Sequence, residues 1–204
     1  PGAVRILGYR NREWMGQFSD AISAYEADPT KNAAACEQAN RFNYESDNAA
    51  APDLCWARKA NIKVGIGINL EQHITEDLGV FFRGMYSDGK SEVQAYTSSD
   101  RSISFGALSR GSPWGRPEDL TGVGIGVGWI SASHARFLKM GGVDGFIGDG
   151  FLTQGAETAY EAFYSLNIIN AVWLSADYQH IVNPAFNVDR GPVNVYGARV
   201  HAEF

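Results

Sequence analysis

Apolar and polar residues alternate along the final stretch of the chain, residues 171–204, which reads AVWLSADYQHIVNPAFNVDRGPVNVYGARVHAEF. Two runs within it, 172–180 and 193–204, place aliphatic and aromatic side chains on one side and mostly polar side chains on the other. A period of two residues predicts β-strands with unlike faces, joined by a Pro-, Asn-, Asp- and Gly-containing connection. The alternation alone is compatible with a sandwich in water as well as with strands in lipid.

Six earlier runs with the same alternation bring the expected total to about eight antiparallel strands. They span residues 4–11, 60–74, 80–86, 92–108, 121–130 and 157–168. Tight turns are expected at 75–78 and, from an Asp-Gly pair, at 87–91. The pattern therefore predicts an all-β fold, and its longer runs have enough residues to cross a bilayer.

The expected connections differ in length on the two sides of the sheet. Those around Thr75, Trp114 and Asn170 are short, whereas residues 13–58 and 131–155 are two long connections. Apolar residues recur at helical spacing within 15–27 and 132–140, so each long connection is expected to carry a helix. Short turns at one rim and long loops at the other are typical of outer-membrane barrels, whose short turns face the periplasm.

Aromatic residues lie near the expected strand ends on the apolar side. They are Tyr86, Trp129, Tyr160 and Tyr178 toward the long loops and Phe204 at the other rim. Rings at these depths are typical of a bilayer interface, although core aromatics of a sandwich would follow the same pattern. Combined with the loop lengths, these aromatic residues favour an antiparallel transmembrane β-barrel. Residues 1–204 would form part of one barrel domain, with both ends of the segment at the periplasmic side.

Composition narrows the class of protein further. The sequence has no uninterrupted apolar stretch as long as a transmembrane helix. Its composition, with 45% hydrophobic and 20% charged residues, does not exclude a transmembrane barrel, because half of every barrel strand is polar. The net charge of −6 argues against binding to nucleic acid. Pro1 is not an initiator Met and nothing at the start resembles a signal peptide, so we expect a mature product or a fragment.

The two cysteines, Cys36 and Cys55, lie in the first long connection. A disulfide between them would close a loop of about 20 residues and would indicate an oxidising compartment. The alternative is two unrelated thiols. Zinc is not expected because no His lies near the pair, and no other metal or cofactor is expected.

Several segments resemble one family in the same order along the chain. DYQHIVNPAFNVDRGPVNVYGARVHAEF at 177–204 resembles the closing segment of the carbohydrate-selective outer-membrane porins of the OprB type. Further segments that resemble this family are GINLEQHITEDLGVFFRGMYSDG from Gly67, SDRSISFGALSRGSPWGRPEDLTGVG from Ser99, and GGVDGFIGDG followed by AETAYEAFYSLNI from Gly141. The resemblance covers about 62–204 and does not include 11–58.

The resemblance implies a barrel of 16 strands in the whole protein, preceded by a signal peptide and an N-terminal segment. Eight strands would then be the C-terminal half, with a closed eight-stranded barrel as the alternative. The difference matters for function, because an eight-stranded barrel fills its interior with side chains whereas 16 strands leave an aqueous channel. Phe204 resembles the C-terminal signal that outer-membrane proteins offer to their assembly machinery.

If the apolar side meets lipid, the opposite side lines the lumen. Its candidates for contact with a sugar are Arg83, Glu161, Asp177, Arg199, Lys63, Glu71 and Trp173. Acids, bases and amides bind hydroxyl groups, which both donate and accept, and rings such as Phe81, Tyr96 and Trp173 can stack on sugars. Asp100 is expected on the same side. The alternative is that these charges pair across neighbouring strands and only hold the wall together.

Three functions fit a barrel of this kind. The first is a porin for mono- or small oligosaccharides, with carbohydrate, lipid and the assembly machinery as partners and a homo-oligomer left open. The second is a small structural or adhesive barrel without an open channel. The third, an outer-membrane enzyme, is disfavoured because the four His residues, at 73, 134, 180 and 201, accompany no nucleophile elbow or metal-binding His pair.

Deletion of Phe204 is expected to impair assembly into the outer membrane, because the aromatic C-terminal residue would no longer be recognised. The amount of folded protein at the surface of intact cells measures this. A Phe204→Tyr variant, which keeps an aromatic ring, serves as the control and should assemble normally. Normal surface levels of the deletion variant would contradict the assignment.

Overall fold

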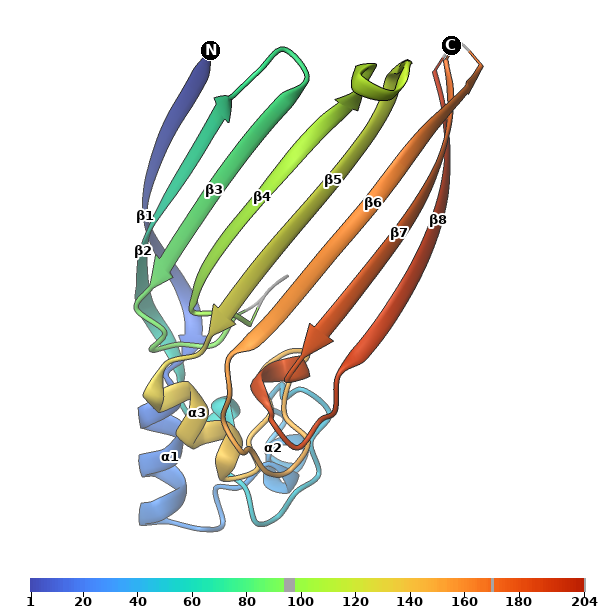
Figure 1. Cartoon of the computed structure of the whole chain (residues 1–204). Coiled ribbons are helices and arrows are strands. Elements are labelled where there is room, and N and C mark those ends of the chain that lie inside the picture. Colours follow the sequence, from blue (N-terminus) through green and yellow to red (C-terminus); the bar gives the residue numbers. More distant parts are fainter. Residues whose placement is uncertain (94–97, 170, 204) are drawn as a thin grey trace.

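The computed structural model describes residues 1–93, 98–169 and 171–203, which form one antiparallel sheet of eight strands (Figure 1). The strands are β1 (Gly2–Gly16), β2 (Arg58–His73), β3 (Leu78–Ser87), β4 (Arg101–Gly111), β5 (Arg116–Trp129), β6 (Glu157–Ile169), β7 (Val172–Val182) and β8 (Val193–Ala202). Each strand pairs with the next one along the chain. The prediction of an all-β antiparallel fold with eight strands is therefore confirmed.

Short helices occupy the connections. They are α1 (Phe18–Ala27), α2 (Ala34–Gln38) and α3 (Ala132–Lys139), with 3₁₀ turns η1 (Leu54–Trp56), η2 (Ser112–Trp114) and η3 (Pro184–Phe186). In α3 the Ser131 side chain accepts a hydrogen bond from the His134 backbone N–H and so caps the helix. Among the described residues, no helix combines the length and the apolar character that crossing a membrane requires.

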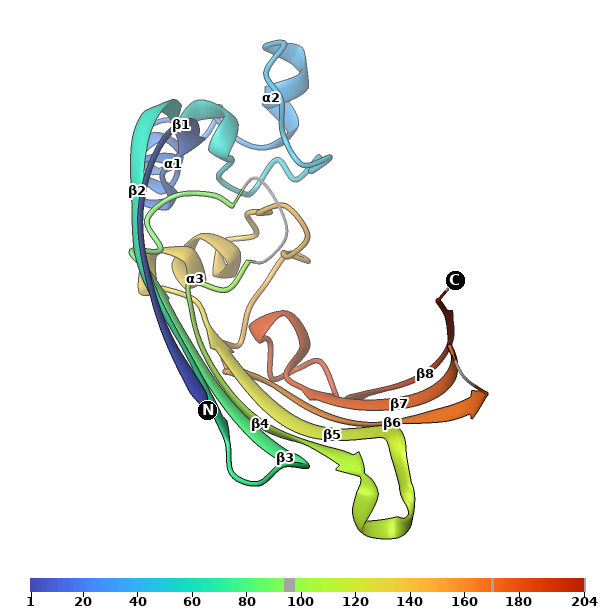
Figure 2. The ribbon, with the colours of Figure 1, turned by 90° about the horizontal axis from the view of Figure 1, so that it is seen from above.

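The sheet curves into an open arc, with β1 at one end and β8 at the other (Figure 2). Within the described chain these two strands do not pair with each other, so the alternative of a closed eight-stranded barrel is wrong. The helices and long connections gather at one rim of the sheet, whereas both chain ends lie at the opposite rim (Figure 1). The expected sorting of long and short connections is thus present.

The convex face of the sheet is apolar and exposed. Paired residues in an antiparallel sheet share a face, and Ile6, Ile68 and Gly84 form one such row. Val123 is 59% exposed, Ile66 54% and Phe105 52%. A continuous apolar surface of this size is far larger than soluble monomers expose, and it is the surface that lipid covers in a transmembrane barrel.

The hydrophobic core lies beside the sheet rather than on it, in the connections at one rim. We call residues 17–57, 88–93, 98–100, 131–156 and 183–192 the loop cap. Phe18, Leu54 and Phe137 are fully buried there. The predicted disulfide is present, between Cys36 and Cys55 at a sequence separation of 19, and closing such a loop contributes about 3 kcal/mol in the chain-entropy model.

The start of β4 differs from the sequence-based prediction. Strand β4 begins at Arg101 rather than at residue 92, and the expected tight turn at 87–91 lies in a longer separation between β3, which ends at Ser87, and β4. The reason is that Glu92 turns into the loop cap, where it accepts a hydrogen bond from the Gly16 N–H at 2.6 Å. Glu92 was expected on a strand because of its place in an alternating run, but its side chain is buried in the cap, whereas residues 94–97 lie outside the described residues.

Strand β1 is also longer than expected. Its register with β2 continues to the pair Gly16 and Arg58, so Met15 belongs to the strand and the helix starts at Phe18. The first long connection therefore begins at residue 17 rather than 13.

Candidate functional site

All seven predicted contact residues lie on strands and face the concave side of the sheet, where they lie at three levels between the loop cap and the short turns. Lys63 lies toward the loop cap, whereas Glu161, Asp177 and Arg199 lie together near the middle of the wall. The remaining three lie toward the short turns: Glu71, Arg83 and Trp173. Phe204 and Tyr96 lie outside the described residues.

The middle group lines a hollow of about 520 Å³ on β6, β7 and β8. Glu161 pairs in register with Gln179, and Arg199 pairs with Ser175, so acid, base, amide and hydroxyl groups sit on adjacent strands. The carboxyl groups of Glu161 and Asp177 interact with each other. Phe163 adds an aromatic ring to the same hollow. This combination provides donors, acceptors and a stacking surface within one patch of the wall.

Glu71 and Arg83, which lie toward the short turns on β2 and β3, already have partners within the wall. Glu71 forms an ion pair with Arg5 at 3.0 Å and accepts a hydrogen bond from Asn69 at 3.1 Å. The Arg83 guanidinium lies 5.2 Å from the centre of the Phe81 ring. For Glu71 the geometry thus matches the alternative in which charges hold the wall together.

Trp173 lies near the other end of the sheet from Glu71. Its indole N–H donates to the Glu118 carbonyl at 3.2 Å, and its ring centre lies 5.7 Å from that of His201. Together with Arg199 they line a hollow of about 210 Å³. The indole is therefore held in place by its N–H while part of its ring remains at the concave surface.

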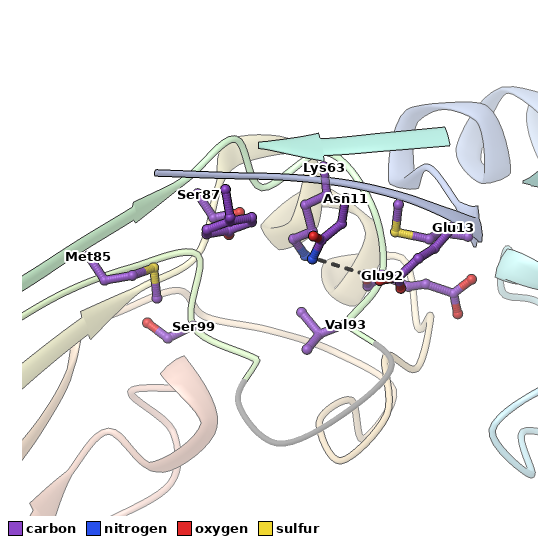
Figure 3. Close-up of a pocket in the computed structure, with 10 residues that line it drawn as sticks. Asn11, Glu13, Lys63, Met85, Ser87, Glu92, Val93 and Ser99 are labelled. Carbon is purple, nitrogen blue, oxygen red and sulfur yellow. Dashed lines mark hydrogen bonds between the residues drawn. The ribbon is translucent and has the colours of Figure 1, made fainter. Parts of the chain in front are cut away.

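A cavity of about 430 Å³ separates the wall from the loop cap (Figure 3). Its labelled residues come from both sides: Asn11, Glu13, Lys63, Met85 and Ser87 from the strands, and Glu92, Val93 and Ser99 from the connection between β3 and β4. Lys63 Nζ donates to the carbonyl oxygens of Ser91 at 3.1 Å and Glu92 at 3.4 Å. Lys63 therefore links the wall to the cap rather than standing free in the lumen.

Glu92 is the centre of a buried ionic contact that the alternation of residues did not reveal. Its carboxylate accepts hydrogen bonds from the Arg58 guanidinium at 2.8 Å and from the Tyr44 hydroxyl at 2.8 Å. Burial and the negative charge of Glu92 both raise the pKa of Tyr44, so that the phenol keeps its proton and donates. This contact fixes the start of β2 to the first long connection.

A second buried cluster joins three parts of the cap. His134 Nδ1 lies 3.0 Å from Asp100 Oδ2, and Nε2 lies 3.2 Å from Asp144 Oδ2, with all three side chains fully buried. The Phe18 ring stacks on the imidazole at 4.2 Å. Burial lowers the pKa of His134, but the two carboxylates outweigh this effect and hold the pKa above its ordinary value.

Asp100 was expected on the lumen side, and the structure corrects this by placing it in the His134 cluster. Besides the imidazole, it accepts a hydrogen bond from the Ser131 N–H at 2.7 Å. Asp100 falls in a run of alternating residues that predicted a strand, so the sequence did not indicate its role in the cap. No pattern in the sequence links residues 100, 134 and 144, because they come together only when the cap folds.

Within the described residues, Cys36, Asp53 and Cys55 are the one group of three potential metal ligands that lies close together. The two sulfur atoms are bonded to each other in the disulfide and are not thiolates. Burial raises the pKa of Asp53 to about 6, while its carboxylate accepts a hydrogen bond from the Cys55 N–H. The group thus serves the cap structure.

Comparison with known proteins gives a consistent result. The family model described as the carbohydrate-selective porin, OprB family, matches residues 1–204. A search of curated proteins finds no match to the chain. The high pH structure of Pseudomonas putida OprB superposes with a TM-score of 0.71 at 18% identity, covering 100% of this chain and 45% of that chain. At that identity the likeness concerns the fold, and this chain spans less than half of the P. putida chain.

The stability of the loop cap is expected to decrease with rising pH. The pKa of His134 is higher in the folded cap than in the unfolded chain. The stabilisation that the protonated imidazole gives the cap is therefore fully present below the unfolded pKa of about 6.5, and it is lost as the pH rises through the folded pKa. The rate of limited proteolysis of the cap, corrected for the pH dependence of the protease, should rise several-fold between a pH below the unfolded pKa of His134 and a pH above its folded pKa.

A His134→Gln variant tests this assignment. It should be cleaved faster than the wild type at pH 6 and should lose the pH dependence, whereas the matched control His73→Gln, outside the cap, should behave as the wild type. Equal pH dependence in the His134→Gln variant would show that another group is responsible.

Proposed function

Because the chain belongs to the OprB family of carbohydrate-selective porins, we propose that it forms part of the wall of a water-filled channel for mono- or small oligosaccharides. The family consists of outer-membrane channel proteins and not of enzymes. The observation that carries the proposal is the division of the sheet into a convex apolar face and a concave face with charged, amide and aromatic side chains. Such a wall separates lipid from water.

The channel is proposed to be a barrel of about 16 strands, of which this chain supplies eight. The free edges of β1 and β8 support this, because unpaired backbone groups at the edge of a sheet are not tolerated in lipid. The coverage of 45% of the P. putida chain agrees with half of a larger barrel. The long connections are assigned to the cell exterior and both ends of the segment to the periplasmic side, by analogy with outer-membrane barrels.

The middle group of the wall is the proposed contact region for sugar. Glu161 and Asp177 can accept hydrogen bonds from hydroxyl groups, and Arg199 can donate to them. Phe163 and Trp173 add rings on which a sugar can stack. Lys63 and Glu71 already have partners in the wall or cap, so we assign them to channel structure. Contact with the assembly machinery and formation of a homo-oligomer stay predictions.

Sugar-induced block of ion current in planar bilayers tests this function. The full protein should show the block. The double variant Asp177→Asn and Arg199→Gln should bind sugar at least about fivefold more weakly, because replacing a hydrogen bond to a charged group (about 1.5–3 kcal/mol) by one to a neutral group (about 0.5–1.5 kcal/mol) costs about 1 kcal/mol. The control likewise removes one acid and one base, but from the cap surface, with Glu26→Gln and Arg136→Gln.

Absence of block by any mono- or oligosaccharide would refute the sugar channel. A block that is equally strong in the double variant and the wild type would refute the assignment of the middle group while leaving the channel in place.

The loop cap is proposed to narrow the channel, because part of it, including α3, lies over the concave side of the sheet (Figure 2) and its segment at Glu92 and Val93 lines a cavity of about 430 Å³ together with the wall. Deletion of residues 28–57 should therefore raise single-channel conductance. The control is the double variant Cys36→Ala and Cys55→Ala, which keeps the length of the loop and should change mean conductance much less. Unchanged conductance in the deletion variant would count against this role.

A further inference from the structure

Three arginines lie on the convex face of the sheet, which is mostly apolar. Arg10 and Arg12 pair in register with Val64 and Ile62, and paired residues share a face. Arg101 pairs with Tyr86 and Trp129, and its guanidinium lies 4.9 Å from the centre of the Tyr86 ring. Their neighbours in the chain point the other way: Asn11 lines the cavity under the cap.

All three arginines lie in the half of their strand that is nearer the loop cap. Arg10 and Arg12 are in the second half of β1, and Arg101 is the first residue of β4. Exposed rings lie on the same side of these strands, namely Trp14, Tyr86 and Trp129. Aromatic residues concentrate at the level of lipid headgroups, so the arginines lie at that depth rather than in the hydrocarbon layer.

In the part of the chain that the structure describes, none of the three arginines forms an ion pair with a carboxylate. The strand acids Glu13, Glu71, Glu157, Glu161 and Asp177 line the concave cavities. The other two, Glu118 and Asp119, lie at the start of β5 near the opposite rim, where Asp119 pairs with Arg116. Arg58, at the cap end of β2, is already paired with Glu92. The convex arginines therefore lack a carboxylate of the sheet as counter-charge.

An uncompensated charge at this surface needs a partner outside the chain. Arginine on the lipid face of a barrel costs about 2–4 kcal/mol at the bilayer centre and about 0–1 kcal/mol near the interface. Arg10 and Arg12 project from the same face about 7 Å apart, so their charges repel each other unless an anion lies between them. The planar guanidinium group binds phosphate through two parallel hydrogen bonds.

We propose that Arg10, Arg12 and Arg101 form a binding surface for the phosphate groups of a membrane lipid at the loop-cap rim. The inference rests on the proposed membrane position of the sheet and is independent of whether sugar passes the channel. Lipid is favoured over free phosphate because the arginines are set in an apolar face on which acyl chains pack, and because the rings beside them mark the headgroup layer.

Native mass spectrometry of the full protein in neutral detergent tests this surface with diphosphoryl lipid A as the probe. The triple variant Arg10→Gln, Arg12→Gln and Arg101→Gln should bind the lipid at least about tenfold more weakly, because charge-assisted hydrogen bonds are lost. The matched control Lys31→Gln, Lys90→Gln and Lys139→Gln removes three exposed charges from the cap and should bind as the wild type. Heat-modifiable mobility on a gel verifies that each variant is folded.

Three results would overturn the proposal. The first is that the triple variant and the wild type bind the lipid equally. The second is that the wild type binds dephosphorylated lipid A as strongly as diphosphoryl lipid A. The third is full displacement of the lipid by millimolar inorganic phosphate, which would indicate a site for the free ion. A change in oligomer mass in the triple variant without loss of lipid binding would identify the surface as a contact between subunits. Loss of sugar block with intact lipid binding would refute only the proposed function.

Discussion

A strand in a lipid layer must direct every backbone N–H and C=O to a neighbouring strand, because no water is present to replace a missing partner. The order β1 to β8, each strand beside the next, meets this requirement for all inner strands. The period of two in the sequence has a separate cause, because successive side chains of a strand point to opposite faces, and in the proposed membrane position these faces meet lipid and water. Connections can leave the sheet only at its rims, which is where all the helices lie.

A sheet with one lipid face and one wet face has no hydrophobic core of its own. The buried apolar residues therefore collect in the loop cap around Phe18, Leu54 and Phe137. Two buried ionic clusters, centred on Glu92 and His134, connect the segments of this cap, and removal of one partner from such a cluster leaves an unpaired buried charge. The fold of the cap is thus stabilised by a small hydrophobic core, by a disulfide and by a few buried polar contacts whose loss would be strongly destabilising.

Charge is distributed unequally over the two faces of the sheet. The concave face carries both acids and bases, which pair with each other in part, as Glu71 does with Arg5. The convex face near the cap carries arginines without carboxylate partners among the described strands. One face can therefore interact with neutral polar solutes through both donors and acceptors, while the other attracts anions at the level of the headgroups.

The strands and their faces could be predicted from the sequence, because alternation between lipid and water leaves a period of two in every strand, and the lengths of the segments between the strands gave the sorting of connections. The sequence also placed Arg83, Glu161, Asp177 and Arg199 on the concave side and suggested the pairing of Cys36 with Cys55. Contacts that join distant segments left no such pattern, so the roles of Glu92 and Asp100 and the true start of β4 were missed. These features depend on how the cap packs, since a polar residue in a folded loop can show the same local alternation as one in a strand and its partners come from distant segments.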